Sequence, residues 1–493
     1  MGQENTNQSR RGLPKTPAFD KLMLSKWAKR GQFEFNHAKN PAWNQAVAAR
    51  RATVYRNFHQ MTSLLGTDQK FALVIPAGTP KTRANDLSYP FRPFSAFSYL
   101  TGLGQDYEPY AVLVLHDQDA CTLYTPSPKD FSTPDFFRNP EFGSFWIGNR
   151  PTPADFENFC DIPSQDLSAL RSSLATLPQE IVAISNIDQN LDQLLNQSGS
   201  YSLKNRSYER FLSETISEAR LIKDDLEVAE IQKAIDFTKL GFENVLSHLK
   251  QILKNPHGER LAESKFHEIA RTLGNWEGYD SIVGAGADAT TLHWMRNSNP
   301  VPAKSLILMD AGVEVDSLYT ADITRTFPVN GRFSPVQKQV YQLVLEAADA
   351  VFEVAQPGNK FSDLNQAAFA VIQRGLIDWG VLPAKPEPDR FRRWIVHGVS
   401  HHLGLDVHDC AQARAEMYYG ATLLPGMCFT IEPGLYFKNE DLSIPQELRG
   451  IGVRIEDNVH LTETGNQNLS ANIPRKLKDV ENWVKSFLNP RRS

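Results

Sequence analysis

Five residues of the types that bind divalent metals are spread through the carboxy-terminal part of this chain, and any fold must bring them together. They are Asp310 in LILMDAG, Asp322 in YTADITRTFP, His401 in HGVSHHLGLDVHD, Glu432 in TIEPGLY and Glu456 in GIGVRIEDN. Four carboxylates and one imidazole form a hard, oxygen-rich ligand set that suits two divalent cations, whereas a lone structural zinc favours Cys and His. The set therefore predicts two-metal hydrolysis.

The first two aspartates are predicted to lie on neighbouring strands. Asp310 ends the apolar run of residues 306–309, and Asp322 begins a second strand. Asp322 should share one face of that strand with Thr324 and Thr326, because side chains alternate along a strand. A short connection would then bring both carboxylates to one point. Either aspartate alone is more typical of a turn or a strand end, and only the later ligands favour a metal site.

A group of four histidines falls within 12 residues: His397, His401, His402 and His408. His397 and His401 are four residues apart and could share a helix face, but the glutamate of an HExxH zinc motif is missing. A single buried histidine is more often a hydrogen-bonded core residue than a ligand. Four so close together indicate a functional site.

Glu432 and Glu456 are both predicted at buried strands. Glu432 closes the strand of residues 428–431, which Pro433 and a glycine terminate. Arg454 and Glu456 alternate with apolar residues, so both should point to the polar face of one strand. A weak surface salt bridge is the alternative interpretation. The apolar neighbours instead indicate a buried strand, in which a carboxylate needs a cation or strong hydrogen bonds.

Composition excludes several classes of partner. The net charge of −5 gives no general affinity for nucleic acid or anionic lipid, and no apolar run reaches the roughly 18 residues of a membrane-spanning helix. The four cysteines are far apart and form no CxxC pair, so a reducing, cytoplasmic location is expected.

At the amino terminus, Met1-Gly2 with Thr6 matches a myristoylation pattern, and SRRGL at residues 9–13 resembles a twin-arginine signal. No apolar stretch follows, so a solvated tail is predicted.

At 493 residues the chain is long for a single core, which favours two domains. Residues 1–16 are polar and predicted to be disordered. Residues 17–212 are predicted to form an α/β domain with one or two leading helices over residues 18–57. Its buried strands are expected at 71–75, 110–115 and 180–184.

Residues 213–493 are predicted to form an α+β domain that carries the chemistry on strands and strand ends. A long amphipathic pattern covers residues 219–254. A second helix opens with Ser334 as its cap and stops at Pro357, and a third follows Ser362.

Taken in order, the phrases DAG…DITRTFP, HGVSHHLGLDVHD, TIEPGLY and GIGVRIED resemble the pita-bread metallopeptidases, most closely the aminopeptidase P (Xaa-Pro aminopeptidase) family. The phrase YPFRPFSAFSYLTG at residues 89–102 is similar to that family's amino-terminal domain. The resemblance implies an α+β fold, with a pita-bread catalytic domain preceded by a smaller α/β domain. It also implies removal of the amino-terminal residue from peptides with proline in second position.

The same resemblance implies roles for individual residues. Asp322 and Glu456 would bridge two metals, Asp310 would complete one site, and His401 with Glu432 would complete the other. Glu432 would also shuttle a proton.

Three histidines, His293, His397 and His408, would contact substrate or stabilise the transition state, and Arg454 would orient the carboxylates. Mn²⁺ is the family's usual metal, and Co²⁺, Fe²⁺ or Zn²⁺ stay open. Proline-containing peptides are the expected partners, and a homo-oligomer (dimer or tetramer) is expected.

The spacing between Asp310 and Asp322 departs from the family. It is 12 residues where relatives have 11, so a bulge or a longer turn is expected within residues 313–319. A shift of strand register would instead turn the two carboxylates to opposite faces.

Two other functions remain open at this point. Prolidase, which cuts only Xaa-Pro dipeptides, would share the metal ligands. Some pita-bread proteins are non-catalytic binding modules, but these have lost the ligands that this chain keeps.

Overall fold

The structure is a computed structural model that describes residues 33–35, 39–104, 109–131, 133–198 and 203–489. The predicted tail at residues 1–16, with its two amino-terminal patterns, lies outside these residues. The chain divides into two compact units, Met1–Glu209 and Arg210–Ser493, each of which is described by itself. None of the helices that the structure describes is long and apolar enough to cross a membrane.

The amino-terminal unit is built on a mixed five-stranded sheet. Its strands are β1 (Phe71–Pro76), β2 (Thr82–Ala84), β3 (Leu87–Ser88), β4 (Val112–Asp117), β5 (Ala120–Thr125), β6 (Ser164–Asp166) and β7 (Glu180–Ala183), and the large sheet has the order β6-β5-β4-β1-β7. The central strand β1 is antiparallel to β4, parallel to β7 and buried along its whole length. The three predicted strands are confirmed as β1, β4 and β7, although β4 begins two residues later than expected.

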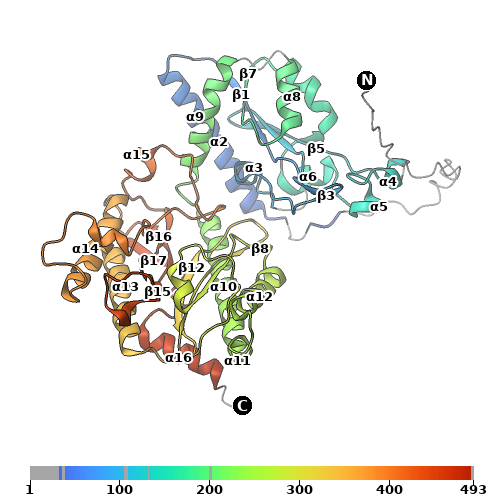
Figure 1. Ribbon diagram of the computed structural model, residues 1–493. Helices are drawn as coiled ribbons and strands as arrows, with labels where there is room; N and C mark the ends of the chain where they lie inside the picture. Colours follow the sequence, from blue (N-terminus) through green and yellow to red (C-terminus); the bar gives the residue numbers. More distant parts are fainter. Residues whose placement is uncertain (1–32, 36–38, 105–108, 132, 199–202, 490–493) are drawn as a thin grey trace, which may run out of the picture. The chain divides into compact units, whose positions relative to one another are not determined.

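Helices of this unit surround that sheet (Figure 1). They are α2 (Pro41–Leu64), α3 (Ser95–Thr101), α4 (Asp135–Arg138), α5 (Ser144–Ile147), α6 (Pro153–Cys160), α7 (Leu170–Thr176) and α8 (Gln189–Ser198). Asn40 caps α2 by accepting from two backbone amides, which is why the helix begins there. The helix predicted over residues 18–57 is found in part as α2, since residues 18–32 lie outside the described chain. The unit boundary falls inside α9 (Leu203–Ala219).

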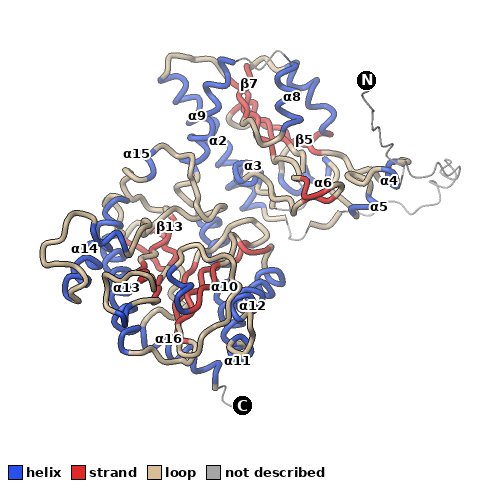
Figure 2. The backbone as a smooth tube through the Cα atoms, viewed as in Figure 1, coloured by secondary structure: helices blue, strands red, loops and turns tan. Residues whose placement is uncertain are grey.

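The carboxy-terminal unit gathers short strands between two groups of helices. The strands are β8 (Trp276–Glu277), β9 (Ile282–Ala285), β10 (Leu306–Ala311), β11 (Val313–Glu314), β12 (Ile323–Pro328), β13 (Cys428–Ile431), β14 (Gly434–Phe437), β15 (Ile451–Arg454), β16 (Asp457–Thr462) and β17 (Gly465–Asn468). The helices are α10 (Asp225–Ser247), α11 (Leu249–Ile252), α12 (Gly258–Leu273), α13 (Pro335–Val354), α14 (Phe361–Asp378), α15 (Ala415–Tyr418) and α16 (Leu477–Leu488). In Figures 1 and 2 the strands lie at the centre, with α13 and α14 on one side and α10 and α12 on the other.

Two of the helix predictions need correction. The pattern over residues 219–254 is not one helix, because α9 ends at Ala219 and Asp224 caps a new helix, α10, through a capping box with Glu227. Ser334 caps α13 as predicted, and Pro335 occupies its first turn. The next helix, α14, begins at Phe361 rather than after Ser362.

The extra residue between the two aspartates is accommodated without a register shift. β10 pairs antiparallel with β12 in one continuous register, with Asp310 opposite Thr324. The connection turns sharply where Val315 and Tyr319 share a backbone hydrogen bond of 3.0 Å, and Leu318 takes a φ of 70° there. The structure therefore has a turn at residues 315–319 and no register shift between β10 and β12.

Candidate metal centre

Strand ends and one loop deliver the predicted ligands to a single cavity of about 770 Å³ in the carboxy-terminal unit. Asp310 lies near the end of β10, and Asp322 immediately precedes β12. Glu432 follows β13, and Glu456 lies in the two-residue gap between β15 and β16. His401 comes from the non-helical loop before α15. All five line the cavity, as the sequence predicted.

The register of β10 and β12 explains how the carboxylates meet. Because Asp310 and Thr324 are opposite each other, their side chains lie on the same face of the sheet. The Thr324 hydroxyl donates to Glu456 Oε2 at 2.7 Å, and the Glu456 amide donates to the Thr324 carbonyl at 3.1 Å. Two hydrogen bonds with the Asn458 side chain hold the backbone of Asp322. The Asp322 amide donates to Asn458 Oδ1 at 3.1 Å, and the Asp322 carbonyl accepts from Asn458 Nδ2 at 2.6 Å. Local pairing thus fixes the position of three of the carboxylates.

The donor atoms fit divalent cations. Ligand atoms of Asp322, His401 and Glu456 lie within 4.8 Å of one another. His401 Nδ1 lies 3.1 Å from the His402 carbonyl, to which only an N–H can donate, so the Nε2 lone pair is left for a ligand role. That Nε2 lies 3.2 Å from Asp322 and 3.5 Å from Glu432. Hard oxygens with one imidazole are the donor set of catalytic divalent metals, so the residues fit the ions that the resemblance implies.

The pKa values show that these carboxylates crowd one another. Burial, and then the negative charge of Asp322, raise the pKa of Glu456 well above its usual value. Burial raises the pKa of Glu432 to about 7. Burial alone would lower the pKa of His401, but its contact with Asp322 and the charge of Glu432 outweigh this and raise it to about 9. The uncompensated negative charge is what a cation would neutralise.

Arg454 supplies the cluster's own positive charge. Its guanidinium is buried and donates to Asp310, to Thr324 Oγ1 at 2.9 Å and to Tyr436 Oη at 2.9 Å. The prediction that Arg454 and Glu456 share one strand is wrong, because β15 ends at Arg454. Both side chains nevertheless reach the cavity.

The three histidines that the resemblance assigns to substrate also line the cavity, but not all four clustered histidines do. His293, His397 and His408 border it, whereas His402 is fully buried and stacks on Phe361, with ring centroids 4.9 Å apart. His397 and His401 lie on a loop, so they do not share a helix face.

A hydrogen-bonded chain orients His397. Its Nδ1 lies 2.6 Å from the Gly398 carbonyl and its Nε2 lies 2.9 Å from the Tyr436 hydroxyl, which accepts from Arg454. Burial, followed by the charge of Arg454, lowers the pKa of His397 to about 3 and keeps the ring neutral.

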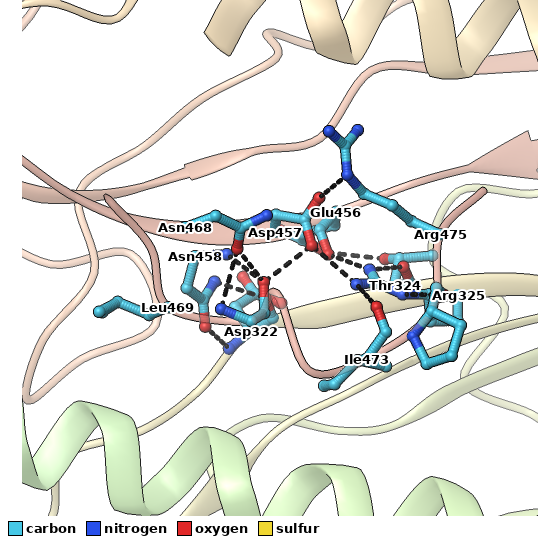
Figure 3. A network of polar contacts seen from close by, with 12 residues as sticks. Asp322, Thr324, Arg325, Glu456, Asp457, Asn458, Asn468, Leu469, Ile473 and Arg475 are labelled. Atoms are coloured by element: carbon cyan, nitrogen blue, oxygen red, sulfur yellow. Dashed lines mark hydrogen bonds and ion pairs between the residues drawn. The ribbon is translucent and has the colours of Figure 1, made fainter. Parts of the chain in front are cut away.

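Several residues that hold the site together were missed from the sequence. Arg325 is fully buried on the face of β12 opposite Thr324. It donates to Asp457 Oδ1 at 2.7 Å and to the Glu456 carbonyl at 2.5 Å, tying β12 to the segment that carries Glu456 (Figure 3). An arginine alternating with buried threonines in a strand was the available signal. Tyr279 donates to Asp310 at 2.6 Å, and no local pattern indicated that contact.

Comparison with known proteins gives matches to both units. Residues 229–463 match the model of metallopeptidase family M24, and residues 47–182 match the amino-terminal domain of aminopeptidase P. Xaa-Pro aminopeptidase 1 of Streptomyces coelicolor is 41% identical over 84% of this chain and 83% of its own length. The Xaa-Pro aminopeptidase of Escherichia coli is 30% identical over 83% of this chain and 92% of its own. The solved structure of E. coli aminopeptidase P in its low-pH form superposes with a TM-score of 0.76 at 28% identity, covering 90% of this chain and 99% of that one.

Proposed function

The chain belongs to metallopeptidase family M24, as a member of its aminopeptidase P branch, and we propose that it releases the amino-terminal residue of peptides whose second residue is proline. It is a metallo-aminopeptidase that binds divalent metal. The predicted fold class, a pita-bread catalytic unit preceded by a smaller α/β unit, is confirmed. The observation that carries the proposal is the convergence of Asp310, Asp322, His401, Glu432 and Glu456 on one cavity.

Two ions are proposed for this ligand set. Asp322 and Glu456 would each contact both ions, Asp310 would complete one site, and His401 with Glu432 would complete the other. Such ions lower the pKa of a water and polarise the scissile carbonyl. Mn²⁺ is the proposed metal, because carboxylate-rich sites suit it, and elemental analysis tests both its identity and the number of ions bound.

Glu432 is proposed to move the proton. Its carboxyl lines the cavity, where it can accept a proton from a water and release it to the leaving group. Glu432 would pass this proton to the proline nitrogen of the leaving group. An amide nitrogen leaves as an amine and not as an anion, so the proline nitrogen must gain a proton before the C–N bond breaks.

His408 is proposed to stabilise the reacting carbonyl. It lines the cavity, and burial together with the charge of His401 lowers its pKa, so the ring is neutral at neutral pH and one N–H can donate. No hydrogen bond joins that ring to another residue that the structure describes, which leaves its donor available for substrate. His293 and His397 are proposed as further substrate contacts.

The cavity favours peptides longer than a dipeptide. A dipeptidase must hold the proline carboxylate, and a cation usually does so. Among the described residues that line the cavity, Arg454 is the one arginine or lysine, and its guanidinium is already bonded to Asp310, Thr324 and Tyr436. This absence of an available cation supports the aminopeptidase over the prolidase alternative.

Matched substrates test the proposal. We expect Mn²⁺-loaded enzyme to cleave Xaa-Pro-Yaa with kcat/KM at least as high as for Xaa-Pro, to release free Xaa, and to cleave Xaa-Ala-Yaa poorly. The Glu432→Gln variant, which keeps the shape of the side chain, is the inactive control. Cleavage confined to Xaa-Pro would show a prolidase, and no cleavage of any substrate would favour a binding protein.

Location and assembly are proposed on separate grounds. All four cysteines are free thiols, which fits the reducing cytoplasm, and fractionation tests this. A homo-oligomer is proposed from the family resemblance, and light scattering measures its mass.

A further inference from the structure

We propose that Arg220, Lys223 and Asp409 form an electrostatic clamp that positions His408 against the reacting carbonyl, an inference that rests on the role proposed above for His408. The clamp lies outside the cavity and touches no metal ligand.

The need for such a clamp comes from how few contacts His408 has. Its ring meets the ring of His401 edge-on, with centroids 4.5 Å apart and planes at 83°. No hydrogen bond or ion pair holds it to any residue in the described part of the chain. The point from which the ring extends is therefore set by the backbone of residues 406–409, and the ring's contact with His401 limits its rotation.

Arg220 contacts the side chains of residues on both sides of His408. Its Nη2 contacts Asp406 Oδ2 at 2.7 Å and also contacts Asp409 Oδ1. Lys223 Nζ donates to the other oxygen of Asp409 at 2.9 Å. The side chains of Lys223 and Asp409 are each 1% exposed and that of Arg220 is 7% exposed, so water screens these contacts little.

The loop is also closed on itself. The Asp409 amide donates to the His402 carbonyl at 2.9 Å, and the Asp406 amide donates to Asp409 Oδ1 at 3.3 Å. A Cβ on Gly404 would lie 2.5 Å from Asp409 Oδ2, so this backbone approaches the Asp409 carboxylate more closely than any side chain would allow. Burial would raise the pKa of Asp409, but Arg220 and Lys223 outweigh it and hold the carboxylate ionised.

Backbone hydrogen bonds connect Lys223 and the loop before His408 to other elements of the unit. The Lys223 backbone amide donates to the Gly426 carbonyl at 2.8 Å, and Lys223 directly precedes Asp224, the cap of α10. In the loop that carries His408, the Gly404 carbonyl accepts from the backbone amide of Thr320 at 3.1 Å, and Thr320 lies two residues before Asp322. The clamp therefore ties the loop of His408 to a long helix and to the hairpin that carries a metal ligand.

Buried ion pairs contribute little net stability, and replacing both partners by neutral side chains of similar shape is often tolerated. The test uses this fact. The double variant Lys223→Met/Asp409→Asn removes one cation and one anion together, so it leaves no unpaired charge at this position and keeps the net charge.

With Mn²⁺ and Xaa-Pro-Yaa, we expect the double variant to lose about tenfold in kcat, with KM and metal content unchanged, because a misplaced donor lowers the rate without weakening substrate binding. The same substitutions in a His408→Ala background should cause no further loss, because their effect runs through His408. Val245→Ala, which removes buried methyl groups near the far end of α10, is the matched control and should lower the unfolding midpoint while leaving kcat unchanged.

Three results would overturn the clamp. They are a wild-type kcat in the folded double variant, an equal loss of kcat in the His408→Ala background, or a normal kcat for His408→Ala alone. If the double variant does not fold, Asp406→Asn weakens the more exposed contact of Arg220 and should lower kcat about threefold with the same dependence on His408. Cleavage of Xaa-Pro-Yaa by the wild-type enzyme tests the proposed function separately.

Discussion

Removal of metal should reverse the pH dependence of this protein's stability. In the metal-free protein, burial raises the pKa of Glu432 from 4.5 to about 7. A carboxyl with a higher pKa in the folded than in the unfolded state carries an extra proton when folded between those two values. Stability is therefore lost as the pH rises from about 4.5 to about 7.

His401 acts in the same direction over a higher range. Its pKa rises from 6.5 to about 9, mainly because its contact with Asp322 outweighs the effect of burial. Its contribution to stability is fully present below pH 6.5 and disappears as the pH rises through about 9. The pKa of Asp322 is lowered below 3.8, so its own titration falls under this window. Burial lowers the pKa values of His397 and His402 to about 3, so these two rings act in the opposite direction and add stability as the pH rises to 6.5.

The magnitude follows from the Glu432 shift. Each pKa unit corresponds to about 1.4 kcal/mol, so this shift alone amounts to on the order of 3 kcal/mol. Metal requires deprotonated ligands, so the metal-loaded protein should instead gain stability as the pH rises.

Urea unfolding at pH 5.5, pH 7 and pH 9 measures both trends. We expect the chelated protein to be less stable at pH 9 than at pH 7, because His401 loses its proton in that range, and the Mn²⁺-loaded protein to be more stable at pH 7 than at pH 5.5. Glu432→Gln is the matched control for the lower range, because it keeps the shape without the titration, and its stability should change less unfavourably from pH 5.5 to pH 7 than that of the chelated wild type. Chelated protein that gains stability between pH 7 and pH 9, or a Glu432→Gln variant with the wild-type slope between pH 5.5 and pH 7, would refute the reasoning.

Other expected outcomes concern single residues. Glu456→Ala should lose both bound metal and turnover, and a variant that keeps two ions with normal kcat would show that Glu456 is not a bridging ligand. His401→Ala should weaken metal binding, whereas His408→Ala should keep its metal and lose about 10²–10³-fold in kcat, as elemental analysis and kinetics will show. The reverse pattern would mean that the two histidines are wrongly assigned. Gly312→Ala should lower the free energy of unfolding by about 1–3 kcal/mol and weaken metal binding. The new Cβ would lie 1.8 Å from the Ala321 carbonyl oxygen and push apart the two segments that carry Asp310 and Asp322. An unchanged unfolding midpoint would contradict this.

Local pattern was enough to place the carboxylates. Asp310 and Glu432 each follow a run of buried apolar residues, and such a run defines both a strand and the point where it ends. The alternation of Asp322, Thr324 and Thr326 predicted a shared face, because the period of a strand is set by the backbone itself. The structure then places Thr324 opposite Asp310 and bonds its hydroxyl to Glu456.

The histidine loop could not be resolved in this way. His401 and His402 are neighbours, yet one lines the cavity and the other stacks on Phe361 in the core. The loop has no regular period, so the direction of each ring depends on what packs against it. The spacing of the histidines indicated that a site lay here, and only the family resemblance singled out His397, His401 and His408, which line the cavity.

Contacts between distant segments were decided by tertiary structure alone. Arg220 and Asp409 are 189 residues apart, and Arg325 and Asp457 are 132 apart. A charged residue in a sequence carries no mark of its partner, because the pairing depends on which segments the folded core brings together and on how far water is excluded from them. The sequence by itself therefore predicted which carboxylates and histidine converge on the cavity, and the tertiary structure decided which buried charges hold them in place.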